Sequence, residues 1–265
     1  MRKLPFRLLA FGIAMIGLYL LGAYVLIPSF WQRYEHQPGL IHMPMVTTTK
    51  QGIPGDPINL ALVGTREEIL AVMKAAGWSL PQPVSWRSSA KIAGSVALRH
   101  SYLFAPVSSL FYHGRRQDLA FEKQQGKDAM RRHHVRLWKV LEQGAEGRPV
   151  WLGAATFDQG IGLSHFTGQI THHISADVDS ERNYLISELN KTRRLTVLYQ
   201  ISGVGPSLGL RNGGGDYYYS DGEVRVGVIA PAAAVQNAVA QEIPAPALVS
   251  LKNMIWATAT GTTGP

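Results

Sequence analysis

The sequence predicts an α+β domain with a mostly antiparallel sheet and two or three helices, preceded by one transmembrane helix. Three observations support this prediction. An uncharged apolar run long enough to cross a bilayer lies near the N-terminus. Short apolar segments separated by glycine and charged turns recur from residue 119 to residue 229, as is typical of strands. Segments with helix caps are few and do not alternate regularly with the strands, which favours α+β over α/β.

The apolar run covers residues 8–27 and reads LLAFGIAMIGLYLLGAYVLI, without a charged side chain. A helix of this length spans roughly 30 Å, the thickness of the hydrocarbon layer. Three basic residues lie within residues 1–7, and Arg33 alone follows closely behind the run. The positive-inside rule therefore places residues 1–7 in the cytoplasm and the main domain outside it, in the periplasm of a Gram-negative cell. A cleaved signal peptide is the alternative, but the run is long for one and its cleavage pattern is weak.

Behind the transmembrane segment, composition divides the chain into three parts. Residues 28–50 are predicted to be a linker, residues 51–230 the folded domain, and residues 231–265 a tail rich in alanine, proline and threonine. The simplest expectation for such a terminal segment is fraying, with a weakly amphipathic helix over 249–256 as the alternative.

The domain is predicted to open with a strand over 58–63 and a helix directly after it. Thr65 and Glu68 have the spacing of a capping box, in which the hydroxyl accepts from the backbone N–H of the glutamate and the carboxylate reaches back. Gly77 suits the left-handed cap at the end of this helix. Residues 85–99 are a second candidate helix.

Short apolar segments after residue 110 predict the other strands of the sheet. Between two of them, acidic residues from Asp177 and basic residues up to Arg194 predict a helix, because this order of charges complements the helix dipole. The predicted strands are 119–121, 133–140, 150–157, 170–174, 195–201 and 224–229.

The chain has no cysteine and a formal net charge of +8. The lack of cysteine excludes disulfides, thiolate metal sites and a cysteine nucleophile. No pattern of a standard nucleic-acid-binding module is present, so no nucleic-acid partner is expected. The positive charge fits attraction to anionic lipid headgroups or phosphorylated glycans, and fits equally a basic surface that keeps the domain soluble.

Two histidine doublets, at 133–134 and 172–173, are candidate site residues. Adjacent side chains on a strand point to opposite faces, so each doublet gives only one histidine to a given face. His134 and His173 each fall on the more polar face of their strand. Together with Asp158 they would suit a zinc or iron site if their strands are neighbours. Histidines with ordinary hydrogen bonds, in the core or in turns, are the alternative.

Arginines and a glycine-rich loop form a second set of candidates. The planar guanidinium fork matches phosphate or carboxylate groups. The loop NGGGD at 212–216 can bring backbone N–H groups close to a ligand, although it matches neither a P-loop nor a dinucleotide fingerprint. A solvated charged face and a plain turn are the alternatives. The candidate ligand-binding residues of the whole chain are Arg115, His134, Arg136, Asp158, His173, Arg211, Asn212, Gly214 and Asp216.

Five strings occur in order along the domain: GDPIN at 55–59, GRRQDLAFE at 114–122, RRHHVRLW at 131–138, GQITHHI at 168–174 and RNGGGD at 211–216. Together they resemble the LssY C-terminal domain family of bacterial proteins, over about residues 55–230. The resemblance implies a domain without an established activity, so it assigns no catalytic residue, metal or cofactor.

Some members of that family carry the domain fused to a lipid phosphatase domain of the phosphatidic-acid-phosphatase type, or to a DedA-like membrane domain. By association, the resemblance implies a role in envelope lipid or glycan metabolism. This chain has a single apolar helix and lacks the KxxxxxxRP, PSGH and SRxxxxxHxxxD motifs of such phosphatases. Phosphatase activity is therefore not carried over.

Three hypotheses for function follow. In the first, the domain binds an anionic envelope lipid or glycan outside the cytoplasm, through His134 and the arginines at 115, 136 and 211. In the second, the domain is a metal-assisted hydrolase of such a substrate, with His134, His173 and Asp158 as metal ligands. In the third, the domain is a scaffold for partner membrane proteins.

Overall fold

The computed structural model consists of two compact units, Met1–Pro38 and Gly39–Pro265. The residues that it describes are 3–27, 29, 36–40, 42–81, 109–126, 128–166, 168, 170–201, 210–232 and 239–261. The candidate helix at 85–99 lies outside them.

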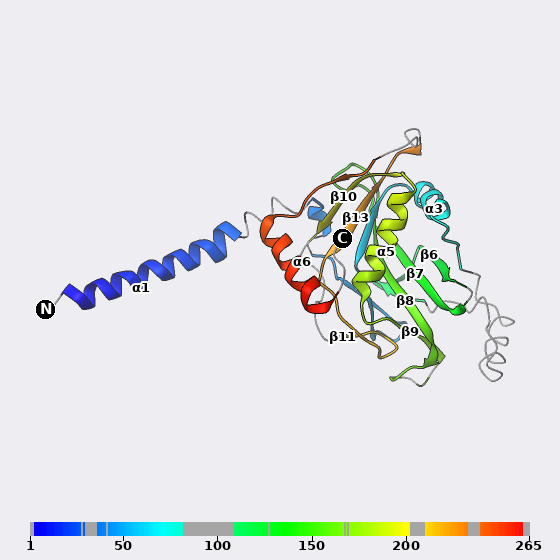
Figure 1. Ribbon diagram of the computed structural model, residues 1–265, viewed down its shortest axis with the longest axis horizontal. Coiled ribbons are helices and arrows are strands. Elements are labelled where there is room, and N and C mark those ends of the chain that lie inside the picture. Colours follow the sequence, from blue (N-terminus) through cyan, green and yellow to red (C-terminus); the bar gives the residue numbers. More distant parts are fainter. Residues whose placement is uncertain are drawn as a thin grey trace. The chain divides into compact units, whose positions relative to one another are not determined.

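The N-terminal unit holds one long helix, α1 (Lys3–Leu21), which continues through a π-helical turn, η1 (Gly22–Leu26) (Figure 1). The stretch Arg7–Leu26 is long and apolar enough to cross a membrane. A continuous helix pairs its backbone polar groups internally, as the interior of a bilayer requires. The helix therefore fits membrane anchoring, and a signal sequence can pass the same test of length and composition.

The second unit is built on an eight-stranded sheet with the order β14-β10-β13-β3-β8-β7-β6, in which β9 also pairs with β8. All of its pairs are antiparallel except β13 with β3 and β10 with β14. With its helices, this mostly antiparallel sheet confirms the predicted α+β class. Its strands are β3 (Leu60–Val63), β6 (Leu119–Gln125), β7 (Asp128–Leu141), β8 (Val150–Leu163), β9 (Ile170–Ile174), β10 (Leu195–Ile201), β13 (Val224–Ile229) and β14 (Gln241–Glu242).

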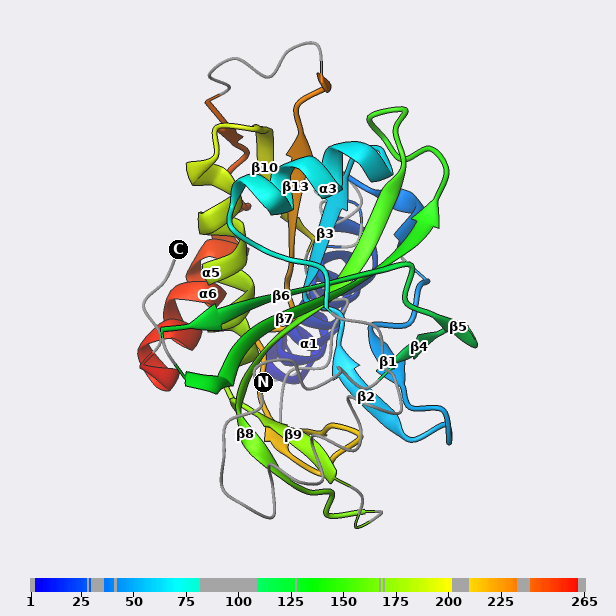
Figure 2. The same cartoon turned by 90° about the vertical axis from the view of Figure 1, so that its right-hand side faces the viewer.

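Two helices, α3 (Arg66–Ala75) and α5 (Val178–Lys191), pack on one face of this sheet (Figure 2). The capping box predicted at the start of α3 is present. The Thr65 hydroxyl accepts from the Glu68 backbone N–H at 3.3 Å, and the Glu68 carboxylate accepts from the Thr65 N–H at 2.8 Å. Asp177 caps α5 through its carboxylate alone, which accepts from the Ser180 backbone N–H at 3.0 Å.

A smaller four-stranded sheet, with the order β2-β1-β4-β5, belongs to the same unit. Its strand β1 falls within residues 28–50, where the sequence predicts a linker. Leu40 and Met45 from the same stretch are buried in the core on the sheet face opposite α3 and α5. Its strands are β1 (Val46–Thr48), β2 (Pro54–Pro57), β4 (Phe111–Tyr112) and β5 (Arg115–Arg116). The domain thus begins before residue 51, through a strand of only three residues that is too short for its alternation to reveal it.

Side chains along β7 alternate between the two faces of the sheet, as the sequence predicts. Val135 and Leu137 join the core under the helices, and Trp138 joins the core on the opposite face. His134 and Arg136 project to the same side as Trp138 because they are separated from it by even numbers of residues. The sheet face opposite α3 and α5 is therefore apolar at its centre and charged at His134 and Arg136 of β7.

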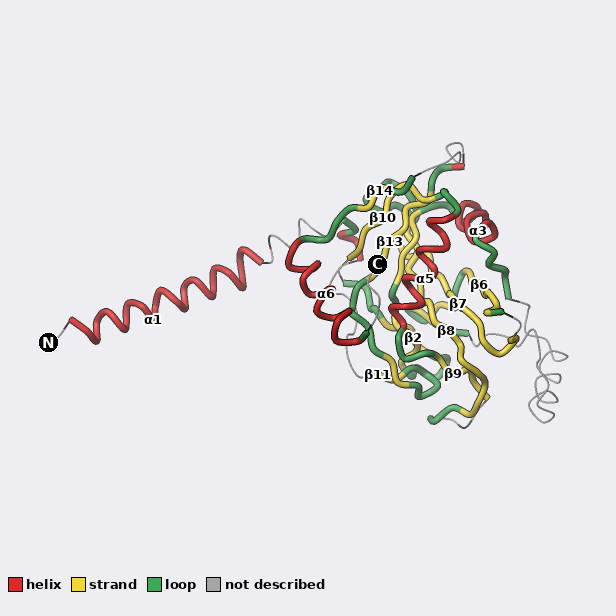
Figure 3. Tube along the Cα trace, in the orientation of Figure 1, coloured by secondary structure: helices red, strands yellow, loops and turns green. Residues whose placement is uncertain are grey.

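Part of the predicted tail is folded against the domain (Figure 3). Strand β14 pairs with β10, and the helix α6 (Ala247–Thr260) follows it. Val249 is buried, and Lys252 forms an ion pair with Glu223 of the strand-bearing domain. The outer face of α6 carries exposed apolar side chains such as Leu248.

Candidate functional site

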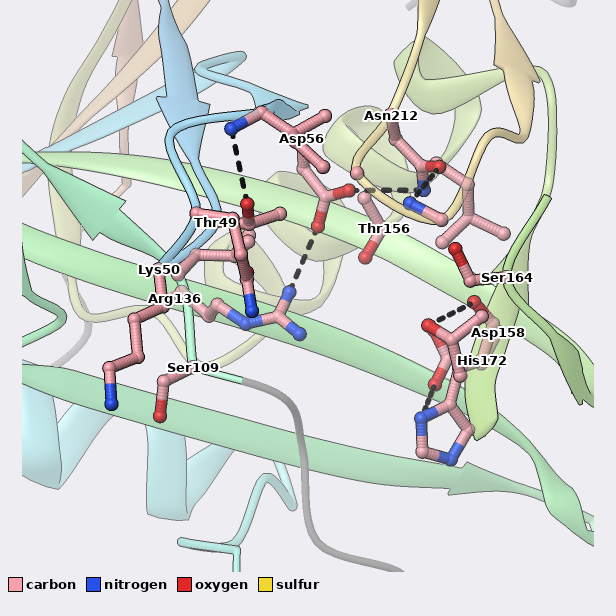
Figure 4. A pocket seen from close by; sticks show the side chains of 17 residues that line it. Thr49, Lys50, Asp56, Ser109, Arg136, Thr156, Asp158, Ser164, His172 and Asn212 are labelled. Atoms are coloured by element: carbon pink, nitrogen blue, oxygen red, sulfur yellow. Dashed lines mark hydrogen bonds and ion pairs between the residues drawn. The ribbon is translucent and has the colours of Figure 1, made fainter. Parts of the chain in front are cut away.

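A cavity of about 160 Å³ lies over β7, β8 and β9, on the sheet face opposite α3 and α5 (Figure 4). Four elements outside the sheet complete its wall: the turn between β1 and β2, the strand β2, the segment before β4, and the glycine-rich loop. This loop joins β11 (Leu210–Arg211) and β12 (Tyr217–Tyr218). The polar lining side chains include Thr49, Lys50, Asp56, Ser109, Arg136, Thr156, Asp158, Ser164, His172 and Asn212.

The register of β7 and β8 gathers charge on the cavity side. Arg132 pairs with Asp158, and His134 pairs with Thr156. Directly opposed residues of an antiparallel pair project to the same face, so the alternate positions of both strands meet there. A row of ionisable groups is therefore buried below the cavity, where a sheet of this size usually places apolar side chains.

His134 and Asp158 form a buried ion pair at the floor of the cavity. Nδ1 of His134 lies 3.1 Å from Oδ2 of Asp158, and Nε2 lies 3.8 Å from Oε2 of Glu122. Burial alone would lower the pKa of His134, but Asp158 raises it above its ordinary value. Burial alone would raise the pKa of Asp158, but His134 lowers it. These opposite shifts favour the ionised form of both groups.

The contacts of this pair are not well-directed hydrogen bonds. Neither ring nitrogen of His134 has a hydrogen-bond partner among the described residues, and the same holds for Oδ2 of Asp158. A pair held by charge at ion-pair distance, with unused donor and acceptor capacity, can gain hydrogen bonds from a ligand or from water.

A second ion pair joins the sheet to the small strands. Arg136 donates from Nη1 to Oδ2 of Asp56 at 3.0 Å, and Asn212 donates to Oδ1 of Asp56 at 3.4 Å. Burial raises the pKa of Asp56 above its ordinary value, although Arg136 opposes this change. Within the described part of the chain, Nε of Arg136 has no hydrogen-bond partner. One donor of this cavity-lining guanidinium is therefore buried without a partner.

His172 supplies a neutral imidazole to the same wall. Burial lowers its pKa to about 4. Its Nε2 lies 2.8 Å from Nη2 of Arg132, and its Nδ1 lies 3.8 Å from Oδ2 of Asp158. Since arginine can only donate, Nε2 accepts and the ring proton is on Nδ1, on the side of Asp158. The cavity lining thus combines two cationic side chains, Lys50 and Arg136, with two carboxyl groups and a neutral histidine.

A family model described as LssY C-terminus matches residues 40–224 of this chain. The chain belongs to this family. Comparison with curated proteins finds no match, and neither does comparison with solved structures. The match contains every residue that lines the cavity, from Thr49 to Gly214, whereas β14 and α6 lie beyond its end. The cavity is therefore built from the part of the chain that defines the LssY C-terminus family.

The structure brings some of the sequence-derived candidates together in this LssY C-terminus domain. Arg136, Asp158, Asn212 and Gly214 line the cavity. His134 lies beneath them, in contact with Asp158.

Other candidates lie apart from the cavity. Arg115 is exposed on β5, where it binds Asp118 at 2.7 Å and the Lys139 carbonyl at 2.7 Å. Arg211 is also exposed, and it donates to the Gly215 carbonyl. These two arginines therefore do not share a cation pocket with Arg136.

The trio of His134, His173 and Asp158 does not converge. His173 instead bonds to Asp216, with Nδ1 and Oδ1 2.6 Å apart. Strand register explains the difference. Asp158 pairs with Ile174 on β9, so the even-numbered side chains of β9 share its face, and His172 rather than His173 lies beside it.

Among the ionisable residues that line the cavity, sequence reasoning missed Lys50, Asp56 and His172. Asp56 has a signal in the sequence, because an acidic residue within a buried strand needs a partner. His172 has no such signal: its isoleucine neighbours predict an apolar face, and only the pairing of β9 with β8 turns that face towards Asp158.

Proposed function

We propose that this chain is a membrane-anchored protein whose domain lies outside the cytoplasm and binds an anionic group of an envelope lipid or glycan in the cavity over β7–β9. The apolar helix near the N-terminus, preceded by basic residues, supports the anchor and its direction. The cavity supports the ligand class, because a phosphate or carboxylate is the group that a buried guanidinium fork recognises.

The observation that carries this proposal is the state of Arg136. Its side chain is 8% exposed, yet Nη1 is its bonded donor to Asp56 and its Nε has no partner among the described residues. Buried donors are normally satisfied, so an unused one at a cavity wall indicates a place for an acceptor. Lys50 adds a second cation to the lining.

Protonation of Asp56 can remove the repulsion between its carboxylate and an incoming anion. Its carboxyl group, with a pKa raised by burial, can take up a proton as the anion binds to Arg136. Asp158 faces His134 at ion-pair distance, which offsets its negative charge when His134 is protonated. The remaining lining is rich in hydroxyl and amide groups, among them Thr156, whose Oγ1 has no partner within the described residues. Such groups match the hydroxyls of glycerol or of a sugar.

Binding can be tested with the full chain in detergent on arrays of phosphorylated lipids and glycans. Arg136→Glu should weaken retention by about tenfold or more, because it removes a charge-assisted hydrogen bond and adds repulsion. Arg115→Glu is the matched control, since it makes the same charge change on an exposed arginine outside the cavity. Equal losses in the two variants, or no retention of the parent protein, would reject the proposal.

A second candidate function is hydrolysis of the bound ligand, favoured by the two carboxyl groups of the cavity. Burial raises the pKa of Asp56, whereas the pKa of Asp158 is lowered by His134 against the effect of burial. Two carboxyl groups whose pKa values are shifted in opposite directions are typical of a general acid and a general base. Asp158 would take a proton from water as the water oxygen bonds to the substrate, and Asp56 would protonate the leaving oxygen as its bond breaks.

Chromogenic glycosides and phosphodiesters test this second function. Product release by the full chain should be lost in Asp56→Asn and in Asp158→Asn. It should persist in Glu142→Gln, which changes an exposed carboxylate outside the cavity. Unchanged rates in the two aspartate variants, or an inactive parent, would exclude hydrolysis of these substrates by the pair.

A further inference from the structure

A second cluster of ionisable side chains lies next to the cavity. His165 follows β8, His173 belongs to β9, and Asp216 ends the loop between β11 and β12. Each offers one ligand atom, and the three atoms lie within 4.8 Å of one another. His165 and His173, which are close in the sequence, thus meet the carboxylate of Asp216 from a distant loop.

The carboxylate of this cluster is held in a fixed direction. Oδ2 of Asp216 accepts from the Ile174 backbone N–H at 3.1 Å, while Oδ1 lies 2.6 Å from Nδ1 of His173. The Asn212 side-chain oxygen accepts from the backbone N–H groups of Gly214 and Asp216 at 3.0 and 2.9 Å. Hydrogen bonds of this kind orient the ligands of metal sites before the metal binds.

Two glycines make room for the imidazoles. A side chain at Gly162 would overlap the ring of His173, and one at Gly215 would meet Cβ of His165 at 2.6 Å. Gly215 also has a φ of +90°, which other residues rarely adopt. The rings of His165 and His173 lie 5.6 Å apart between their centroids. The backbone is thus shaped around both histidines.

Electrostatics distinguishes this cluster from the one in the cavity. Beside Asp158, the potential ligand His172 is occupied by Arg132 at 2.8 Å, and a cation there would be repelled by that guanidinium. Among the described residues, no lysine or arginine forms a hydrogen bond or ion pair with the side chains of His165, His173 or Asp216. Arg211 donates to the neighbouring Gly215 carbonyl rather than to a ligand atom, so no cation occupies the ligand atoms of this cluster within the described residues.

We propose that His165, His173 and Asp216 bind one divalent transition-metal ion of the zinc type. Two imidazole nitrogens and one carboxylate oxygen suit such ions, whereas magnesium and calcium prefer oxygen ligands alone. The ion would replace the hydrogen-bonded proton between His173 and Asp216. Since His165 is exposed, further coordination positions are open to water or to a ligand. This inference is independent of anion binding to Arg136.

Zinc titration of the full chain in detergent, after treatment with a chelator, tests the site. Calorimetry should give about one equivalent of Zn²⁺ per chain, with a proton released on binding. Co²⁺ in place of Zn²⁺ should give the visible absorption of a low-coordinate site. His165→Ala changes an exposed side chain and so keeps the fold, and His173→Ala removes the second imidazole. Each should weaken binding by about tenfold or more.

The neighbouring histidine provides the control. His172→Ala changes the other member of the doublet, which faces Asp158, and should keep the zinc affinity within about threefold of the parent. Circular dichroism confirms that each variant is folded. The proposal is overturned by the lack of saturable zinc binding in the parent, by binding that survives in both His165→Ala and His173→Ala, or by an equal loss in His172→Ala.

Discussion

The domain contains two buried clusters of charge that differ in how completely their groups are bonded. In the first, on α5 and the segment before β13, Arg182 donates to both oxygens of Asp221 at 2.7 and 2.9 Å and to the Glu223 carbonyl at 2.9 Å. Asp179 accepts from the Ser220 hydroxyl at 2.8 Å and from the Asp221 backbone N–H at 2.7 Å. This cluster ties a helix to the sheet.

In the second cluster, which lies at the cavity, several groups do not use their hydrogen-bonding capacity. Nε of Arg136, Oγ1 of Thr156 and both ring nitrogens of His134 have no hydrogen-bond partner within the described residues. Unpaired buried polar groups cost free energy, so they persist where something other than stability maintains them. Bonding state, rather than burial or charge, therefore distinguishes these two clusters.

The largest expected loss of stability is in the first cluster, formed by Arg182, Asp179, Asp221 and Ser220, which we call the saturated cluster. Arg182→Met removes the bidentate pair and leaves Asp221 and Asp179 buried without their cation, which should cost about 3–5 kcal/mol of unfolding free energy. Arg136→Met should cost less, because Asp56 can take up a proton in its place. Urea unfolding of both variants, followed by tryptophan fluorescence, measures the difference. Equal losses would remove the distinction between the clusters.

The His134–Asp158 pair should give the cavity cluster a bounded pH dependence. The lowered pKa of Asp158 contributes stability above its unfolded value of about 3.9, and this is lost as pH falls through the folded pKa. The raised pKa of His134 contributes stability below about 6.5, and this is lost as pH rises through the folded pKa. The destabilisation caused by Asp158→Asn should therefore be largest near about pH 5 and smaller at both extremes. If the loss of unfolding free energy in Asp158→Asn were constant from acid to alkaline pH, the pair would not be ionic.

A smaller effect is expected from one hydroxyl of the saturated cluster. The Ser220 hydroxyl donates to Asp179 and accepts from the Gly222 backbone N–H at 3.1 Å. Ser220→Ala leaves both partners buried and should cost about 1–2 kcal/mol of unfolding free energy. The same urea unfolding series measures it.

The smallest effect on stability is expected from the equivalent change in the cavity. Thr156→Val removes a buried hydroxyl that has no partner among the described residues, so the unfolding free energy should change by less than about 0.5 kcal/mol. Retention on the phosphorylated arrays should nevertheless decrease. A loss of stability as large as that of Ser220→Ala would mean that the hydroxyl is structurally bonded.

Local patterns predict much of this fold. The strands at 195–201 and 224–229 coincide with β10 and β13. The cap of α3 and the left-handed conformation of Gly77, with a φ of +78°, also follow from the residues themselves. These features depend on interactions between residues that are close in the sequence, so local sequence patterns are enough to predict them.

The candidate site was only partly predictable, because it depends on how strands pair. Alternation alone places His134 and Arg136 on one face. The choice between His172 and His173 requires the register of β9 on β8, and the role of Asp56 requires contact between β2 and β7. Arg115 and Arg136 look equivalent in the sequence, but one lies at the sheet edge and the other beside the cavity.

The anion site is tested most directly by the dissociation constant of glycerol 3-phosphate for the full chain, measured by calorimetry with lysine in place of Arg136 or of Arg115. Arg136→Lys keeps the charge but loses the planar fork, and should raise Kd by about tenfold. Arg115→Lys should leave Kd unchanged, because that side chain lies outside the cavity. Equal constants for the two variants, or no saturable binding by the parent, would contradict the assignment of the cavity as an anion site.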